Sequence, residues 1–123
     1  MRILVVEDEH KIASSIKRGL EQENYAVDVA YDGTEGFDLA ASEPYDAIVL
    51  DRLLPGIEGA KIAAKLREQQ IHTPVIMLTA KGQQSDRDWA ISVGTDYFLT
   101  KPFSPIELFN LIEKILSKSK VED

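Results

Sequence analysis

The stretch AIVLDRLLPG, residues 47–56, is the segment from which the fold can be predicted. An uninterrupted apolar run ends at Asp51, and a proline and a glycine follow shortly after it. Such a short continuous run is typical of a strand buried on both faces of a parallel sheet. A carboxylate beside a buried strand is costly unless something pairs with it. Asp51 is therefore either a turn residue at a strand end or an acid placed there for chemistry.

The same kind of apolar run recurs along the chain and alternates with segments of helical spacing. Strands are predicted at residues 3–6, 25–30, 46–50, 75–78 and 97–99. Helices are predicted at residues 11–22, 34–41, 57–67, 83–93 with Gly94 as a C-terminal cap, and 105 to about 116. Five strand-then-helix units predict one α/β domain, a doubly wound parallel sheet with helices on both faces. The polar end SKSKVED, residues 117–123, is interpreted as a fraying tail or a truncated linker.

Composition narrows the classes of function. The chain has 123 residues and a net charge of −7, which disfavours binding of nucleic acid or of an anionic membrane surface by this domain itself. It has no cysteine, which excludes disulfides and thiolate zinc sites. There is no signal peptide pattern, and no apolar run approaches the roughly 20 residues of a membrane span. A cytoplasmic domain is the resulting expectation.

Polar side chains follow most of the predicted strands. In a parallel sheet of this kind, ligands bind at the carboxyl ends of the strands. The residues predicted to meet at that edge are Glu7, Asp8 and Glu9 after the first strand, Asp51 after the third, Thr79 after the fourth and Lys101 after the fifth. The second strand ends in AYDG, which is interpreted as a plain turn.

Each of these residues also has an ordinary structural interpretation. Asp8 or Glu9 could cap the helix that follows, and Lys101 could be solvated. His10 and His72 are interpreted as surface residues. Several acids and one lysine at a single sheet edge, however, are not needed for stability, because the carboxylates would repel one another.

A divalent cation would relieve this repulsion. Glu7 or Asp8 together with Asp51 offers the all-oxygen ligands suited to Mg²⁺. If all three acids contribute, Mg²⁺ and Lys101 bring the site to neutrality. A carboxylate beside Mg²⁺ and an ammonium can act as a nucleophile toward a phosphoryl group.

The segments LVVEDE, VLDRLLPGIEG, VIMLTAKG and DYFLTKPFSPIEL occur in this order and together closely resemble the receiver domain of two-component response regulators. The amino-acid sequences of these segments are most similar to those of the winged-helix (OmpR/PhoB-type) transcription regulators. The resemblance covers essentially the whole chain, with residues 1–119 as the receiver domain and 120–123 as a tail or truncated linker. It implies a flavodoxin-like, CheY-like (βα)5 sheet with the strand order 2-1-3-4-5.

The resemblance also implies the role of each site residue. Asp51 matches the phosphoacceptor that a sensor histidine kinase charges. The Mg²⁺ ligands would be Glu7, Asp8, Asp51 and the backbone carbonyl of Leu53. Thr79 matches the hydroxyl that moves to bond the phosphoryl group, and Lys101 matches the lysine that pairs with it. The domain would catalyse its own phosphorylation and dephosphorylation.

Further expectations concern the switch and its output. Phe98 matches the aromatic switch position, although it could be an ordinary core aromatic. The bond before Pro102 is expected to be cis. The face formed by residues 83–93, 97–99 and 105–116 would change on phosphorylation and pair two receivers, with DNA bound by a C-terminal effector domain. Tyr97 replaces a usual aspartate there and Leu111 a common arginine, so the usual salt-bridge pairing is not expected to be complete, and these two residues could instead make an apolar contact.

Three rival functions fit parts of the pattern. A flavodoxin-like flavin carrier would need a hydroxyl- and glycine-rich loop where Glu7, Asp8 and Glu9 stand. A phosphatase with an aspartyl intermediate generally needs a second acid two residues after the first, and that position here is Leu53. The remaining alternative is a receiver-like docking module that works without phosphorylation.

Overall fold

The computed structural model describes residues 1–52, 54–80 and 95–121, and in it five parallel strands form one sheet in the order β2-β1-β3-β4-β5. Their short apolar runs favour strands because both faces are buried. The strands are β1 (Arg2–Val6), β2 (Ala26–Ala30), β3 (Ala47–Asp51), β4 (Val75–Ala80) and β5 (Tyr97–Lys101). The predicted fold class and strand order are confirmed.

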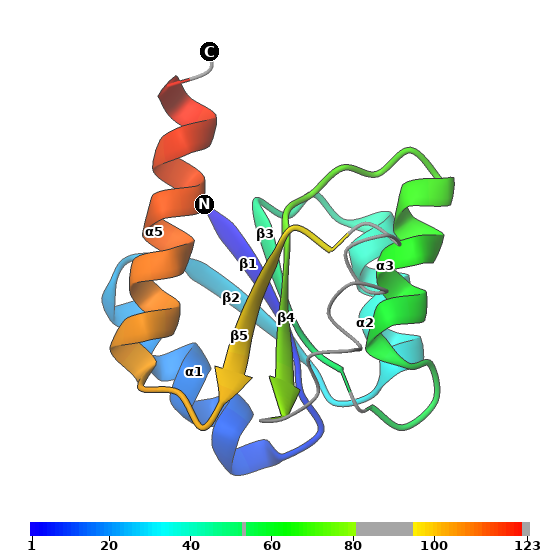
Figure 1. Cartoon of the computed structure of the whole chain (residues 1–123), viewed down its shortest axis with the longest axis horizontal. Helices are drawn as coiled ribbons and strands as arrows, with labels where there is room; N and C mark the ends of the chain where they lie inside the picture. The colour runs from blue at the N-terminus through cyan, green and yellow to red at the C-terminus, as the bar shows by residue number, and fades with distance from the viewer. Residues whose placement is uncertain (53, 81–94, 122–123) are drawn as a thin grey trace.

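Helices cover both faces of this sheet. They are α1 (His10–Gln22), α2 (Gly33–Ser42), α3 (Gly59–Glu68) and α5 (Pro105–Val121). Figure 1 shows α1 and α5 on one side of the sheet and α2 and α3 on the other. The predicted helix over residues 83–93, with its cap at Gly94, lies outside the described residues. Two layers of helices around one sheet are the arrangement that the alternating pattern predicts.

The core divides into two clusters because successive residues of a strand point to opposite faces. Ile3 and Val5 of β1 join the cluster that packs against α1 and α5. Leu4 and Val6 join the cluster that packs against α2 and α3. Both sets are fully or almost fully buried, which explains why the strand reads as a continuous apolar run rather than an alternating one.

Strands β4 and β5 each continue two residues past the predicted range, and two helix boundaries differ from the prediction by two residues or more. Helix α3 begins at Gly59, two residues later than expected, because the chain before it folds back and the Gly59 N–H donates to the Arg52 carbonyl at 3.0 Å. Helix α5 continues to Val121, past Leu116 where its apolar spacing ends. Residues 117–121 are therefore helical rather than a fraying tail, since helical backbone bonding does not require an apolar side chain in every turn.

The loop between β3 and α3 is held against the start of α2. The Gly33 N–H donates to the Pro55 carbonyl at 2.9 Å, and a Cβ at position 33 would overlap the backbone of Ile57. Gly56 has φ of 85°, a left-handed conformation that glycine adopts without strain. Backbone contacts thus hold Pro55 and Ile57 of this loop against the start of α2.

A polar cluster joins the strands at their amino ends. The Asp28 Oδ2 atom accepts hydrogen bonds from the Tyr45 hydroxyl at 2.7 Å and from Arg2 Nη2 at 2.8 Å. The Arg2 guanidinium also lies 4.9 Å from the centre of the Tyr45 ring. This cluster ties β1, β2 and the segment before β3 together.

Candidate functional site

The acids of the site come from two neighbouring strands at the carboxyl edge of the sheet. Glu7 and Asp8 directly follow β1, and Asp51 is the last residue of β3. Because Val6 is level with Leu50 in the sheet, the parallel register brings these residues together. One oxygen from each of the three carboxylates lies within 4.8 Å of the others. Glu7 and Asp51 are buried, whereas Asp8 is exposed and opens the cluster to solvent.

Lys101, the last residue of β5, supplies the cation that faces these acids. Its Nζ atom donates to Asp51 Oδ2 at 3.0 Å and to Glu7 Oε1 at 3.2 Å. The other Glu7 oxygen, Oε2, accepts the backbone N–H of Glu9 at 3.2 Å. The Lys101–Pro102 peptide bond is cis. One ammonium thus bridges two buried carboxylates that belong to different strands.

The protonation equilibria of the site reflect this crowding. Burial, together with the hydrogen bond and the charge of Asp51, raises the pKa of Glu7 to about 7, against the smaller opposing effects of the Glu9 N–H and Lys101. Burial lowers the pKa of Lys101, but its bonds to Asp51 and Glu7 outweigh this, so the net pKa is above the usual value. The Lys101 ammonium therefore stays charged at neutral pH, while the carboxyl group of Glu7 loses its proton less readily than an ordinary glutamate does.

The hydroxyl and the aromatic residue of the predicted switch lie on β4 and β5. Thr79 is buried near the end of β4, one residue beyond the position level with Asp51. Phe98 is half-buried on β5 and packs against the α2–α3 side of the core. Leu53, the predicted carbonyl ligand, lies outside the described residues.

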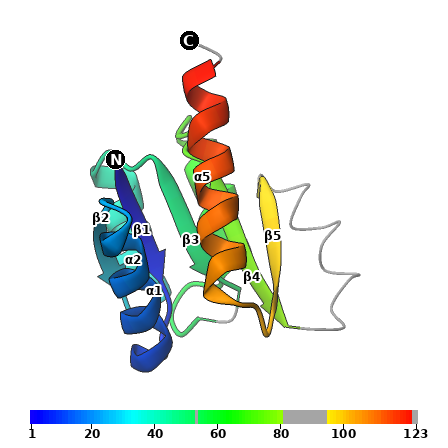
Figure 2. The same ribbon diagram turned by 90° about the vertical axis from the view of Figure 1, so that its left-hand side faces the viewer.

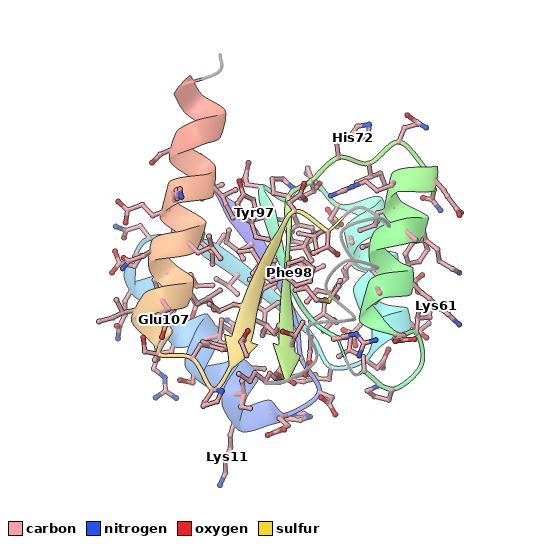
Figure 3. All side chains as sticks on the ribbon, viewed as in Figure 1. Lys11, Lys61, His72, Tyr97, Phe98 and Glu107 are labelled. Carbon is pink, nitrogen blue, oxygen red and sulfur yellow. The ribbon has the colours of Figure 1, made fainter. Side chains whose placement is uncertain are left out.

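The ordinary interpretations of the acids do not fit the structure. Helix α1 begins at His10, and Glu9 at its N-cap position makes no side-chain capping bond. Asp51 accepts a hydrogen bond from Lys101 of a different strand. In contrast, Asp32 of the AYDG turn does cap α2, since its side chain accepts the Glu35 N–H at 2.8 Å. The surface interpretation of the histidines is confirmed, and Figure 3 shows His72 at the opposite, amino edge of the sheet.

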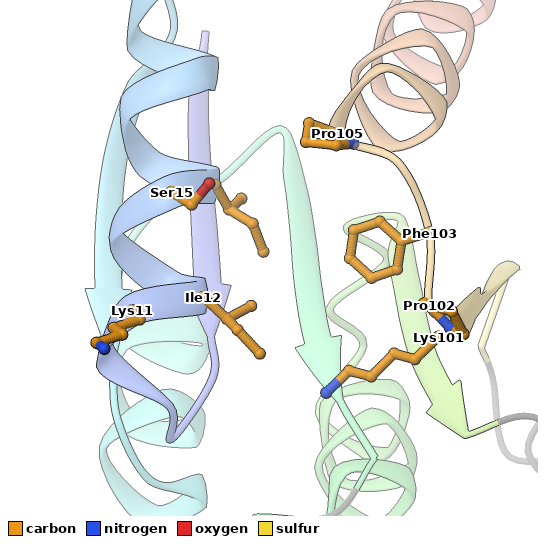
Figure 4. A pocket seen from close by; sticks show the side chains of 8 residues that line it. Lys11, Ile12, Ser15, Lys101, Pro102, Phe103 and Pro105 are labelled. Atoms are coloured by element: carbon orange, nitrogen blue, oxygen red, sulfur yellow. The ribbon is translucent and has the colours of Figure 1, made fainter.

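A hollow of about 540 Å³ adjoins the site, between α1 and the chain that joins β5 to α5. Figure 4 shows Ile12 and Ser15 on its α1 side, Phe103 and Pro105 on the other, and the Lys101 side chain running along its base. Sequence analysis did not predict this feature. The two prolines around Phe103 indicate an irregular turn, but they do not indicate how far this turn lies from α1.

Tyr97 and Leu111, the two residues that depart from the usual pairing face, are both half-buried. They pack against the α1–α5 side of the core. Tyr97 and its neighbour Phe98, both labelled in Figure 3, therefore belong to opposite faces of β5. Much of the apolar surface of Tyr97 and Leu111 is already used within the domain.

Comparison with known proteins assigns this geometry to a family. The family model described as the response regulator receiver domain matches residues 3–113. The chain belongs to the response regulator receiver family. Its acids and lysine stand on the strand ends of a receiver domain, as the sequence motifs predicted.

Two curated relatives show the same kinship. The transcriptional regulatory protein TcrA of Mycobacterium tuberculosis is 47% identical over 109 residues, which are 89% of this chain and 43% of TcrA. The response regulator ArlR of Staphylococcus aureus is 43% identical over 122 residues, which are 99% of this chain and 55% of ArlR. This receiver domain therefore spans about half the length of these relatives.

Solved structures agree with the fold. The receiver domain of the Francisella response regulator 1452 superimposes with a TM-score of 0.91 at 36% identity, covering 96% of this chain and 98% of that one. A CheY-like receiver domain protein from Methanospirillum hungatei JF-1 gives a TM-score of 0.92 at 29% identity, covering 99% and 98%. Within the described part of this receiver domain, none of the helices has the length and apolar character to cross a bilayer.

Proposed function

We propose that this receiver domain is a phosphorylation-dependent signalling switch in which Asp51 accepts a phosphoryl group from a sensor histidine kinase. The observation that carries the proposal is the bridge from Lys101 to the buried carboxylates of Asp51 and Glu7, at 3.0 and 3.2 Å. A structural ion pair would need one acid, whereas here a third carboxylate, that of Asp8, adds repulsion. Phosphoryl transfer gives a reason for this excess of charge.

The residues fit a divalent cation with a preference for oxygen. The carboxylates of Glu7, Asp8 and Asp51 gather within 4.8 Å, and these are hard ligands of the kind Mg²⁺ takes. Glu7, Asp8, Asp51 and the backbone carbonyl of Leu53 would hold the ion. When bound, Mg²⁺ would supply positive charge that stabilises the oxygens of the phosphoryl group during transfer.

In the transfer itself, a carboxylate oxygen of Asp51 forms a bond to phosphorus. The bond between phosphorus and the histidine nitrogen of the donor breaks, and its electron pair stays on that nitrogen. Lys101 moves its ammonium from the Asp51 carboxylate to a phosphoryl oxygen, where it offsets the added charge. Attack by water on phosphorus later restores the carboxylate and releases inorganic phosphate, so the domain catalyses both steps on itself.

The phosphoryl group acts on output by shifting an equilibrium between two conformations. Thr79 would donate its hydroxyl to a phosphoryl oxygen, and Phe98 would turn into the space that opens. The altered face, which includes β5 and α5, would control dimerisation and the binding of DNA by a C-terminal winged-helix domain beyond the receiver unit of residues 1–119. With a sensor kinase as its phosphoryl donor, this switch would act in the cytoplasm.

The coupling role of Thr79 can be tested separately from phosphorylation. We expect Thr79→Ala to accept the phosphoryl group but to lose the response of the Phe98 ring, since the methyl side chain cannot donate a hydrogen bond. NMR of the Phe98 ring signals, before and after phosphorylation, measures this response. Thr79→Ser keeps the hydroxyl and should restore it. A full response in the alanine variant would contradict the coupling.

The decisive experiment is the intact mass of the chain after incubation with acetyl phosphate and Mg²⁺. We expect a gain of one phosphoryl group in the native chain, and none without Mg²⁺ or in Asp51→Asn. Asp46→Asn is the matched control, because it removes an aspartate at the amino end of the same segment and should still be phosphorylated. No gain in the native chain would favour a docking module that works without phosphorylation.

A further inference from the structure

A second hollow lies on the outer surface, between the end of α1 and the first half of α5, two helices that Figure 2 shows side by side. It has a volume of about 450 Å³. Its lining consists of Glu23, Tyr25, Ile106, Phe109, Asn110 and Glu113. None of these residues belongs to the phosphorylation site. The side chain of Ile106 is 67% exposed, so part of the apolar lining has no cover within the described structure.

The lining combines apolar walls with uncompensated negative charge. Tyr25 and Phe109 contribute aromatic rings, while Glu23 and Glu113 contribute carboxylates on the two sides of the hollow. Neither glutamate forms an ion pair with any side chain that the structure describes. Burial, followed by the charges of Glu113 and Glu23, raises the pKa of Tyr25.

These features are chemically selective. A cation over an aromatic ring is attracted by the negative face of the ring, and a carboxylate adds to that attraction. An apolar surface beside two carboxylates suits a ligand whose methylene groups carry two ammonium groups. A single inorganic cation would gain nothing from Ile106 or Phe109, and an anion would be repelled by both glutamates.

We propose that this hollow is a binding site for an aliphatic diamine or polyamine, with ammonium groups at Glu23 and Glu113 and the methylene chain against Phe109 and Ile106. The net charge of −7 on the whole chain favours approach of such a ligand. The site lies on the α1–α5 face, so its occupancy would act on α5 independently of the proposed chemistry at Asp51.

The test is an NMR titration of the 123-residue chain with 1,5-diaminopentane, following the ring signals of Tyr25 and Phe109. Pentylamine has the same five-carbon chain with one ammonium group, and 1,5-pentanediol has that carbon chain with no charge. Binding should be saturable for the diamine, about two- to fivefold weaker for pentylamine, and absent for the diol. Glu23→Gln and Glu113→Gln should each weaken diamine binding by a similar factor, and raised salt should weaken it further.

Glu68→Gln is the matched control, since it removes the same charge from an exposed position on α3. It should leave diamine binding unchanged. Equal binding by all variants, or no saturable response in the native chain, would overturn the proposal. Equal affinity for pentylamine would overturn the proposal that both ammonium groups of the diamine are bound. A response to a lysine-rich peptide but not to the diamine would also overturn it, because the site would then be a protein contact.

Discussion

Glu7 bears much of the unfavourable free energy of gathering carboxylates at this site. Its side chain is fully buried, its pKa is raised to about 7, and Asp51 and Asp8 both face it. A buried carboxylate next to a second one is unfavourable unless cations compensate both. Lys101 compensates part of this charge, and the proposed divalent cation would compensate the rest.

Asp8 allows this preference to be measured as stability. Without Mg²⁺, we expect Asp8→Asn to be more stable than the native chain, because one of three mutually repelling carboxylates is neutralised. With Mg²⁺ at a hundred times its Kd, the native chain should gain about 2.7 kcal/mol in the free energy of unfolding. The variant should gain much less, and EDTA should remove the gain from both. Urea unfolding with and without Mg²⁺ measures these differences.

Glu9→Gln is the control for that comparison, since it changes the same charge one residue later, outside the group of three carboxylates. It should respond to Mg²⁺ as the native chain does. An unchanged Mg²⁺ response in Asp8→Asn would show that Asp8 does not hold the ion.

The sequence was sufficient to predict which residues meet at the site. Glu7, Asp8, Asp51 and Lys101 each follow a short apolar run, and parallel strands place such positions at one edge. The hollow beside Lys101 could not be predicted in this way, because its shape depends on the path of residues 102–105 relative to α1. Local patterns carry no information on that distance.

At the scale of elements, the segment after β3 is positioned by helix α2. The backbone of Gly33 contacts that of Pro55 and Ile57, so the start of α2 packs directly against this part of the loop. Backbone atoms cannot move aside as a side chain can. The contact therefore requires a residue without a Cβ.

Gly33→Ala tests this contact. We expect the free energy of unfolding to fall by about 1–3 kcal/mol, since the added methyl group overlaps the Ile57 carbonyl and forces the loop away. Urea unfolding measures the change. Asp38→Ala, an exposed change in the same helix, should stay within about 0.5 kcal/mol of the native chain. An alanine variant as stable as the native chain would mean that the backbone around Ile57 can shift to accept the methyl group at little cost in free energy.

Helix and strand positions could largely be predicted, and the errors have local causes. The start of α3 was misplaced because Ile57 continues the apolar spacing, although the chain is still part of the loop there. The end of α5 was misplaced because residues 117–121 are polar or at the chain end, and polar helical turns resemble a tail. Periodicity detects the buried part of a helix and misses the rest.

At the scale of the whole molecule, the two edges of the sheet differ in their electrostatics. The carboxyl edge holds acids in excess, while at the amino edge Asp28 is paired with Arg2 and Tyr45. The hydrogen bond from Tyr45, with help from Arg2 and against the effect of burial, lowers the pKa of Asp28. These three residues are far apart in sequence, so no local pattern could predict that they meet.

The amino-edge cluster predicts a loss of stability in acid. A carboxyl whose pKa is lower in the folded state contributes stability above its unfolded pKa, about 3.9, and loses it as the pH falls through the folded pKa. We therefore expect Asp28→Asn to be less stable than the native chain at pH 7, with the difference shrinking below about pH 4. Urea unfolding at several pH values measures this.

Tyr45→Phe provides the matching control. It removes the hydroxyl that donates to Asp28. Like Asp28→Asn, it should therefore make the free energy of unfolding less dependent on pH in acid. The double variant should lose less than the sum of the two single losses, because both act on one contact. A difference between Asp28→Asn and the native chain that stays constant with pH would contradict this account.

The bridge between Lys101 and Glu7 joins residues 94 positions apart in the chain. During synthesis, the acids leave the ribosome long before the lysine that neutralises them. A chain interrupted before β5 would carry the proposed acceptor aspartate without the lysine that faces it. The ability to be phosphorylated would therefore report that the last strand has been made and has docked, so unfinished copies could not transmit a false signal.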